Sequence, residues 1–227
     1  MATSRKRSSR NRKPLNRERV LAAAVELADR EGLEALSMRR LGAELGVEAM
    51  SLYNHVANKD DLLDGIVDAV TAEFDDPRSV PGSDWRQVIR RCASTEREVL
   101  LRHPWTASLA ESRARTGPVR LRYYDALLGV LREAGFSQLG AYRANLTIDS
   151  YVYGFTLQEV AWEAWPQTDG GGFEAAASFV ERTGPDEYSN LSGIAELAAG
   201  GGIDIGADFA AGLDVILDSL ERMREAS

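Results

Sequence analysis

Two short helical segments joined by a very short break limit the fold of this chain more than any other feature. Ser37 can cap the first segment, in which Leu41 and Leu45 share one face, and Gly46 is placed to end it in a left-handed conformation. The next helix must then begin within about three residues, which is the turn length of a helix-turn-helix. The stretch from Ser37 onward therefore predicts this motif.

An earlier segment completes a small three-helix unit. Asn16 can cap it and Gly32 can end it, and the apolar residues between them follow helical spacing: Val20, Ala24, Leu27 and Ala28. In the helix after the turn, Leu52 and Val56 are four residues apart, so both are expected to point into the core of this unit.

The opposite side of that third helix carries an unusual set of side chains. It belongs to Met50, Tyr53 and Asn54, with Ser51 and His55 at its edges, where a plain surface helix would carry Glu, Lys and Arg. Hydroxyl, amide and imidazole groups can bond phosphates or base edges, and a thioether can contact a thymine methyl. One exposed Tyr or His usually has no function, but the whole set on a helix-turn-helix indicates a DNA-reading surface.

The charge is distributed unevenly along the chain, although its net value is −8. Residues 1–59 carry 12 Lys and Arg against 7 Asp and Glu, whereas residues 60–227 carry 15 against 28. Only the basic end suits a polyanion. Its first part is expected to be a flexible arm, for which a solubilising tail is the alternative, and its basic residues are Arg5, Lys6, Arg7, Arg10, Arg12 and Lys13.

Composition excludes several classes of protein. A chain of 227 residues, of which 44% are hydrophobic, can bury a sizeable core. No apolar run approaches the roughly 20 residues that span a bilayer, and no apolar segment follows the charged N-terminus. The single cysteine, Cys92, cannot form an internal disulfide. We therefore expect a cytoplasmic protein with no membrane partner.

An enzyme is disfavoured. Cys92 and His103 lie eleven residues apart on one expected helix, which separates them by about 16 Å of rise and is too far for a nucleophile and its base. The acidic residues are scattered, no glycine-rich phosphate loop follows a strand, and two histidines make a metal site improbable. We expect no catalytic residue, no metal and no cofactor.

The residues from about Arg17 to Phe74 resemble the N-terminal domain of TetR-type transcriptional regulators. The segment "ALSMRRLGAELGVEAMSLYNHVANKDDLL" carries that family's small N-cap, its Arg pair and its "LGV", "LY", "HV", "NK" and "LL" positions. The resemblance implies a recognition helix that meets DNA, a phosphate contact at the start of the next helix, and a lever role for that helix. It assigns DNA contacts to Ser37, Arg39, Ala49, Met50, Ser51, Tyr53, Asn54, His55 and Lys59.

Ala49 and Met50 depart from the residues that the tetracycline repressor itself carries, so its operator sequence does not transfer to this chain. The fourth helix is expected to start at Asn58 and to run to Phe74 before "DDP". Its apolar face is too wide for the three-helix unit alone and should pack on a second domain.

The second domain is expected to be entirely helical. The expected helices are 84–102, 105–113, 118–134, 137–165, 186–199 and 204–224, with a further short segment at 173–182. The segments "DWRQVIRRCASTEREVLLRHP" and "NLTIDSYVYGFTLQEVA" resemble the C-terminal domain of the tetracycline-repressor branch.

Two of these helices suggest self-association. Apolar side chains surround 137–165, and the last helix carries a stripe formed by Phe209, Leu213, Ile216, Leu217, Leu220 and Met223, with Gly206, Ala210 and Gly212 beside it. A monomer would leave one of these faces in water. The favoured interpretation is a homodimer with a four-helix interface. The alternative is that both stripes belong to the ordinary core.

The second domain is also rich in aromatic and amphipathic side chains. We expect a ligand pocket formed by Trp105, Tyr123, Tyr124, Asn145, Tyr151, Tyr153, Phe155 and Trp162. Such a cavity suits a small hydrophobic, oxygen-bearing effector. No histidine follows His103, so the ring that holds magnesium on the next helix of the tetracycline repressor has no counterpart, and we expect metal-free binding.

The sequence therefore predicts an all-α fold in three parts: a basic flexible arm at 1–15, a three-helix helix-turn-helix DNA-binding domain at 16–61, and a helical ligand-binding and dimerisation domain at 62–227. We expect a regulator, most readily a repressor, that a small effector releases from a palindromic double-stranded DNA operator. The alternative is an architectural or global DNA-binding protein without a ligand, for which the large aromatic second domain is unexplained.

Overall fold

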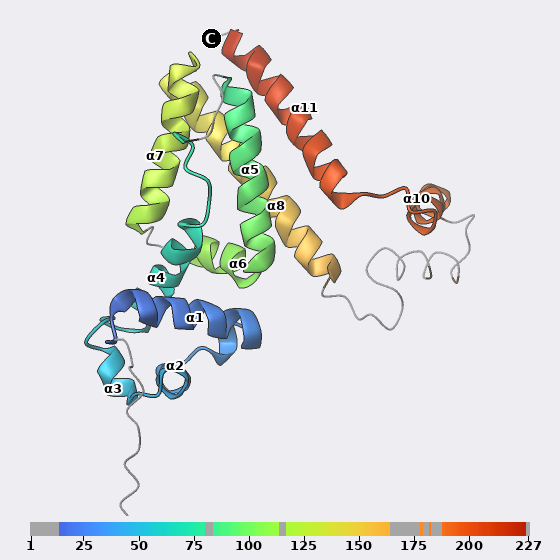
Figure 1. Cartoon of the computed structure of the whole chain (residues 1–227). Coiled ribbons are helices and arrows are strands. Elements are labelled where there is room, and N and C mark those ends of the chain that lie inside the picture. Colours follow the sequence, from blue (N-terminus) through green and yellow to red (C-terminus); the bar gives the residue numbers. More distant parts are fainter. Residues whose placement is uncertain are drawn as a thin grey trace, which may run out of the picture. The chain divides into compact units, whose positions relative to one another are not determined.

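The computed structural model describes residues 14–79, 84–113, 117–163, 178, 182 and 188–225, and helices are the regular elements of these ranges (Figure 1). The predicted all-α class is confirmed. Contacts along the chain define two compact units, Met1–Ile66 and Val67–Ser227. Within the described ranges, no helix is both long and apolar enough to cross a membrane. Most of the expected basic arm lies outside the described residues.

The first unit consists of α1 (Arg17–Glu31), a 3₁₀ turn η1 (Leu33–Ala35), α2 (Met38–Leu45), α3 (Ala49–Leu52) and the start of α4 (Lys59–Thr71). The expected caps are present. The side-chain oxygen of Asn16 accepts a hydrogen bond from the backbone N–H of Arg19 at 2.9 Å, and the Ser37 hydroxyl accepts one from Arg40 at 3.2 Å. Asn58 begins α4 by accepting from the backbone N–H of Asp61 at 2.8 Å.

Two glycines make the tight turn between α2 and α3 possible. Gly46 ends α2 with φ 66° and ψ 39°, the left-handed conformation that the sequence predicts there. Gly42 lies inside α2, and a Cβ atom at this position would approach the carbonyl oxygen of Val47 to 2.9 Å and the backbone nitrogen of Ala49 to 3.2 Å. The missing side chain at Gly42 therefore lets the backbone of the turn lie directly against α2.

Small and medium apolar side chains fill the core of the first unit. Leu52 is fully buried and Val56 is 2% exposed, which confirms the inward direction predicted for both. They share this core with Val20, Ala24, Leu27, Leu36, Leu41, Leu62 and Ile66. Because Leu52 and Val56 are held inward, the intervening Tyr53 and Asn54 are forced outward.

The described part of the second unit contains the rest of α4 and the helices that follow it. Its helices are α5 (Trp85–Arg102), α6 (Trp105–Ser112), α7 (Pro118–Glu133), α8 (Gln138–Glu163), α10 (Ser189–Ala199) and α11 (Ile205–Glu225). Each begins and ends within three residues of its expected bounds. Within this unit α8 packs against α5, α7 and α11 (Figure 1). The expected segment 173–182 falls almost wholly outside the described residues.

Aromatic contacts and part-buried ion pairs join the helices of the second unit. The rings of Trp85 and Phe136 meet edge to face with centroids 5.2 Å apart. Arg97 of α5 donates to Glu159 of α8 at 2.8 Å, and its guanidinium also lies 5.2 Å from the centre of the Phe209 ring of α11. One arginine therefore ties α5, α8 and α11 together.

The end of α4 differs from the expectation. The helix ends at Thr71 and does not continue to Phe74. The hydrogen bonds tighten there from four-residue to three-residue spacing, since Glu73 donates to the carbonyl of Val70 at 3.0 Å and Phe74 to that of Thr71 at 3.1 Å. This turn places Phe74 in the core, where it is 8% exposed.

The apolar stripe of the last helix also differs from the expectation. Its main members, Phe209, Leu213, Leu217 and Leu220, are at most 5% exposed, and they lie in the core of the second unit. A Cβ atom on Gly212 would come within 2.2 Å of the Tyr151 hydroxyl, so this glycine makes room for an internal contact. The stripe of the last helix is thus ordinary core, as the alternative interpretation held for this one of the two helices.

Candidate functional site

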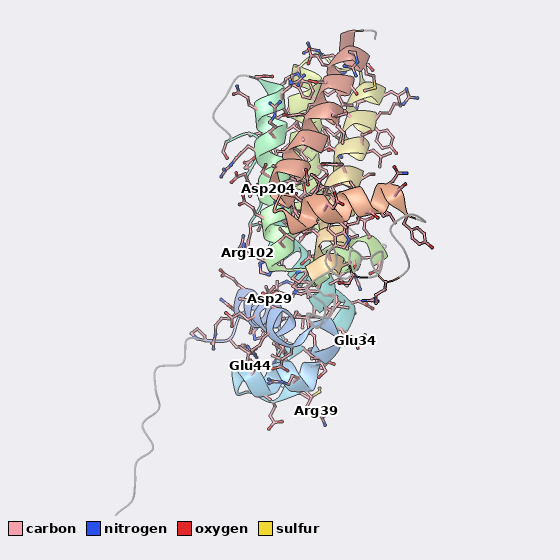
Figure 2. All side chains as sticks on the ribbon, turned by 90° about the vertical axis from the view of Figure 1, so that its right-hand side faces the viewer. Asp29, Glu34, Arg39, Glu44, Arg102 and Asp204 are labelled. Atoms are coloured by element: carbon pink, nitrogen blue, oxygen red, sulfur yellow. The ribbon has the colours of Figure 1, made fainter. Side chains whose placement is uncertain are left out.

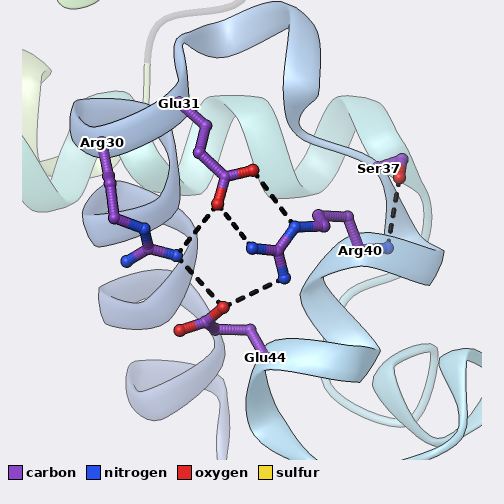
Figure 3. A network of polar contacts seen from close by, with 5 residues as sticks. All are labelled: Arg30, Glu31, Ser37, Arg40 and Glu44. Atoms are coloured by element: carbon purple, nitrogen blue, oxygen red, sulfur yellow. Dashed lines mark hydrogen bonds and ion pairs between the residues drawn. The ribbon is translucent and has the colours of Figure 1, made fainter.

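The two neighbouring arginines of α2 have different surroundings. Arg40 donates to Glu31 at 3.1 Å and to Glu44 at 3.1 Å, and Arg30 donates to the same Glu44 carboxylate at 3.1 Å (Figure 3). The hydrogen bond from Arg40 is the main reason why the pKa of Glu31 lies below its usual range. These pairs join α1 to α2.

Arg39, in contrast, is exposed on the surface of the helix-turn-helix unit (Figure 2). In the described part of the chain no hydrogen bond or ion pair engages its guanidinium. Arg40 is therefore structural, and Arg39 is the member of the pair that can reach another molecule. The sequence shows only two adjacent arginines; the difference depends on which of them faces α1.

The predicted reading surface is exposed, and it consists of a short helix and the turn that follows it. α3 is only Ala49–Leu52, and Asn54 and His55 lie in the turn that follows it. Met50 is 74% exposed and Tyr53 is 43% exposed. Asn54 and Lys59 are exposed as well, whereas Ala49, Ser51 and His55 are half-buried. Ser37 is exposed, although its oxygen already caps α2.

Hydrogen bonds and an ion pair that the sequence does not reveal hold this turn in place. Arg17, the first residue of α1, donates to the backbone carbonyl of His55 at 3.1 Å and to the Asp61 carboxylate at 2.8 Å. Asp61 also accepts from the backbone N–H of Ala57 at 2.8 Å, and these bonds lower its pKa. Arg17 and Asp61 are 44 positions apart, too far for sequence spacing to indicate a pair.

Six of the eight residues expected to form a ligand pocket fall into two groups around α8. In the first group Tyr124, Asn145 and Tyr153 lie near Arg120, whose guanidinium centre is 5.4 Å from the Tyr124 ring centre and 5.8 Å from that of Tyr153, and the Tyr123 ring lies 6.1 Å from that of Tyr124. A pocket of about 340 Å³ opens beside them between α6, α7 and α8. Tyr124 and Asn145 both line it.

The second group lies against α11. Tyr151 donates its hydroxyl to the carbonyl of Phe209 at 2.9 Å and stacks on that ring, and Phe155 meets the same ring edge to face at 5.3 Å. Residues 151 and 155 share one side of a helix, and residues 145, 149 and 153 share another. Trp105 packs beside His103 with ring centres 6.3 Å apart, and Trp162 is half-buried near the end of α8.

Charged residues in the first group were not predicted from the sequence. Arg120 donates to the Tyr124 hydroxyl at 3.0 Å and to Glu111 at 2.9 Å, and Tyr124 donates to Asp149 at 3.0 Å. Glu96 of α5 is 4% exposed, and burial, followed by the nearby charge of Asp149, raises its pKa to about 8. The spacing of Arg120 to Tyr124, and of Asn145 to Asp149 to Tyr153, is a four-residue signal that could have indicated this cluster.

The residues weighed for catalysis do not form a reactive pair. Cys92 is buried, and burial raises the pKa of its thiol to about 12, which opposes formation of the thiolate. His103 lies beyond the end of α5, 3.4 Å from Glu73. In the described ranges, no group of three or more His, Cys, Asp or Glu side chains is arranged to hold a metal ion.

Comparison with known proteins accounts for both units. Residues 20–66 match the family of bacterial regulatory proteins of the tetR type, and residues 77–224 match the tetracycline-repressor-like C-terminal domain. An HTH-type transcriptional regulator of Saccharopolyspora erythraea is 36% identical over 82% of this chain and 78% of its own length. The HTH-type transcriptional repressor DrrR1 of Streptomyces coeruleorubidus is 34% identical over 95% of this chain and 81% of its own.

A solved structure agrees with these relatives. The TetR family protein ActR of Streptomyces coelicolor, in complex with actinorhodin, superposes with a TM-score of 0.76 at 28% identity, and the match covers 93% of this chain and 99% of that one. The relatives are regulators of transcription and not enzymes. This chain belongs to the TetR family of DNA-binding transcriptional regulators.

Proposed function

We propose that this protein is a dimeric repressor that a small molecule releases from a palindromic DNA operator. The observation that carries the proposal is the exposed surface of Arg39, Met50 and Tyr53, fixed on a turn that Gly42 and Arg17 hold in shape. Side chains on a rigid support can read base edges, and the guanidinium of Arg39 can donate two hydrogen bonds to a guanine or a phosphate. The proposal places the protein in the cytoplasm, where its DNA partner lies.

The connection to a ligand is supported by contacts at the end of α4. This helix begins in the helix-turn-helix unit, and its second half belongs to the second unit. There Asp68 accepts from the backbone N–H groups of Val119 and Arg120, at 3.2 and 3.3 Å, at the start of α7. Just beyond α4, the Phe74 ring meets Tyr123 at 5.2 Å. A molecule that displaces Arg120 or Tyr123 would therefore act on α4, and linkage requires DNA to weaken that molecule's binding equally.

The proposed dimer uses the outer faces of α8 and α11. Leu157 is 36% exposed and Val215 is 67% exposed, and the small residues Ala161, Ala207 and Ala211 near them are also exposed. Small side chains allow helices of two protomers to approach closely, and an interface of this kind is symmetric about a two-fold axis. DrrR1 is a repressor by name, and ActR has been solved with actinorhodin. Both support the repressor and effector parts of the proposal.

The first test is sequence-specific DNA binding. Selection from random duplexes should yield an inverted repeat, and in moderate salt the protein should bind it more tightly than a scrambled duplex by about 10³-fold or more. Arg39→Ala should relax the selected sequence, whereas Arg122→Ala, at an exposed arginine of α7, should leave it unchanged. Equal affinity for the selected and scrambled duplexes would refute the DNA-reading function.

The second test concerns the metal-free effector. Tetracycline with and without magnesium should leave the protein bound to its operator, as followed by fluorescence anisotropy of labelled DNA, whereas an apolar oxygen-bearing metabolite should release it. Magnesium-dependent release at micromolar tetracycline would contradict metal-free binding. If no compound of a broad library alters the complex, the architectural alternative replaces the effector part of the proposal.

A further inference from the structure

The pocket between α6, α7 and α8 combines apolar walls with a polar floor. Tyr142 and Leu146 of α8 are 57% and 49% exposed and form part of its wall. Arg120, Tyr124 and Asp149 also line it, and its volume of about 340 Å³ holds a small molecule. The nature of the floor decides which molecules fit.

The charge of Arg120 is already matched within the protein. Its guanidinium donates to the carbonyl of Ala110 at 3.2 Å, to Glu111 at 2.9 Å and to the Tyr124 hydroxyl at 3.0 Å. Only a small part of this side chain reaches solvent, since Arg120 is 8% exposed. Arg120 therefore has few donors left for an anionic ligand.

Within the described ranges, two carboxyl groups near Arg120 form no such ion pair. Asp149 accepts a hydrogen bond from Tyr124 at 3.0 Å, and Glu96 accepts one from Tyr123 at 3.4 Å. The other carboxyl oxygen of Glu96, Oε1, is buried and has no hydrogen-bond partner in the described part of the chain. In those same ranges no Lys, Arg or His forms an ion pair with either carboxyl group, although Arg113 also lines the pocket.

A buried carboxylate without a cation is unfavourable, because burial removes water that tyrosine hydroxyls replace only in part. Burial raises the pKa of both groups, and so does a nearby acid, Asp149 for Glu96 and Glu111 for Asp149, whereas the charge of Arg120 lowers the pKa of both. Three tyrosine rings lie beside these groups: Tyr123 at Glu96, Tyr124 at Asp149 and Tyr153 at Arg120. Carboxylates and ring faces are the two groups that attract a cation.

We propose, on the basis of the ligand-responsive function proposed above, that the effector carries a protonated amine on a flat apolar body. The amine binds at Asp149, and the body packs on Tyr142 and Leu146, which line the same pocket. The positive charge supplies the ion-pair partner that Asp149 lacks in the described ranges. An apolar molecule whose only polar groups are hydroxyls leaves the charge of Asp149 unmatched and binds more weakly.

Three fluorescent probes with the same ring system test the charge requirement: 2-(1-naphthyl)ethylamine, its N-acetyl derivative and 1-naphthylacetate. Titration into the full-length protein at pH 7 should show the amine binding at least ten times more tightly than either of the others. Asp149→Asn should remove that preference. The controls are Asp125→Asn and Glu98→Gln, exposed carboxyls of α7 and α5, which should retain it.

Circular dichroism and thermal melts show whether each variant is folded. The inference is overturned if the amine binds no better than its acetylated form, if no probe binds, or if a folded Asp149→Asn protein keeps the preference. A protein that binds its operator and is released only by neutral compounds would sink this inference and leave the proposed function standing. Failure to bind any DNA specifically would remove the function itself, whatever the probes do.

Discussion

The carboxyl group of Glu96 makes the stability of the protein depend on pH in an unusual direction. Its pKa is raised to about 8, mainly by burial, from the ordinary value of 4.5. The folded protein therefore keeps a proton that the unfolded chain releases above pH 4.5, so folding becomes less favourable as pH rises towards 8. The contribution is fully present below the unfolded pKa and is lost on passing through the folded one.

Glu96→Gln should remove this dependence. Between about pH 5 and pH 8 the wild type should lose up to about 1.4 kcal/mol of unfolding free energy per pH unit more than the variant. Urea unfolding followed by tryptophan fluorescence at several pH values measures the difference. Glu98→Gln, at an exposed position on the same helix, should follow the wild type. Parallel curves for the wild type and Glu96→Gln would show that the carboxyl titrates normally.

Lys59 and Asn54 are expected to contribute to DNA binding in different ways. Lys59→Ala removes a charge at the start of α4, so affinity for all duplexes should fall together and the slope of log affinity against log salt should flatten by roughly 0.9. Asn54→Ala should instead change the preferred sequence, because an amide can read adenine through two hydrogen bonds. Affinities for the selected operator and its single-base variants at several salt concentrations separate the two. If Lys59→Ala lost affinity only for duplexes with particular bases, Lys59 would be a base-reading residue and not a phosphate contact.

At the scale of elements, the turn between α2 and α3 depends on a glycine in the middle of a helix. Glycine there usually costs about 1 kcal/mol relative to alanine, so a substitution ought to be favourable. At Gly42, however, the added Cβ would approach backbone atoms, which cannot move aside as a flexible side chain can. The turn must open to accommodate it.

Gly42→Ala should therefore weaken specific DNA binding and lower the melting temperature. The matched control is Gly129→Ala in α7, where a Cβ atom would meet nothing within 4 Å and where the gain in helix propensity should stabilise the protein by about 0.5–1 kcal/mol. Thermal melts and operator titrations of both variants make the comparison. Unimpaired DNA binding in Gly42→Ala would show that the close approach has no influence on the reading surface.

Helical periodicity and turn residues were sufficient to predict most elements and their caps, because Asn16, Ser37 and Gly46 act on their immediate neighbours. The features that were missed have two causes. The Arg17 to Asp61 ion pair and the internal use of Gly212 depend on residues far away in the sequence, whereas α4 ends at Thr71 through a local change to three-residue hydrogen-bond spacing. The aromatic residues of the second unit were recognised, but their division into two groups required the packing of α11 on α8.

At the scale of the whole molecule, the proposed dimer predicts both an interface and an operator geometry. Val215→Glu places a charge on the exposed face of α11 and should shift the protein to monomers in sedimentation velocity, with loss of binding to the inverted repeat. Leu121→Glu, at a residue of α7 that is 56% exposed, is the control and should remain dimeric. The half-site centres should lie about 34–36 Å apart, or a multiple of this. A dimeric Val215→Glu protein would place the interface elsewhere.

The basic arm is expected to add affinity without specificity. Deleting residues 1–13 removes six Lys and Arg, so affinities for operator and random duplex should fall by the same factor, and the salt dependence should become shallower. Titrations over a range of salt concentrations measure this. Unchanged affinity at every concentration would make the arm a solubilising tail.

The shortness of α3 limits how much sequence information one protomer can extract. A helix of four residues and the turn behind it present only a few side chains, enough to specify about three or four base pairs. A DNA sequence of that length occurs by chance very often among the roughly 10⁶ or more positions of a genome. A single protomer would therefore be bound mostly at chance matches. Requiring the same half-site sequence twice, at a fixed distance and in inverted order, makes a chance match far less frequent. Two half-sites of low specificity can therefore specify one operator.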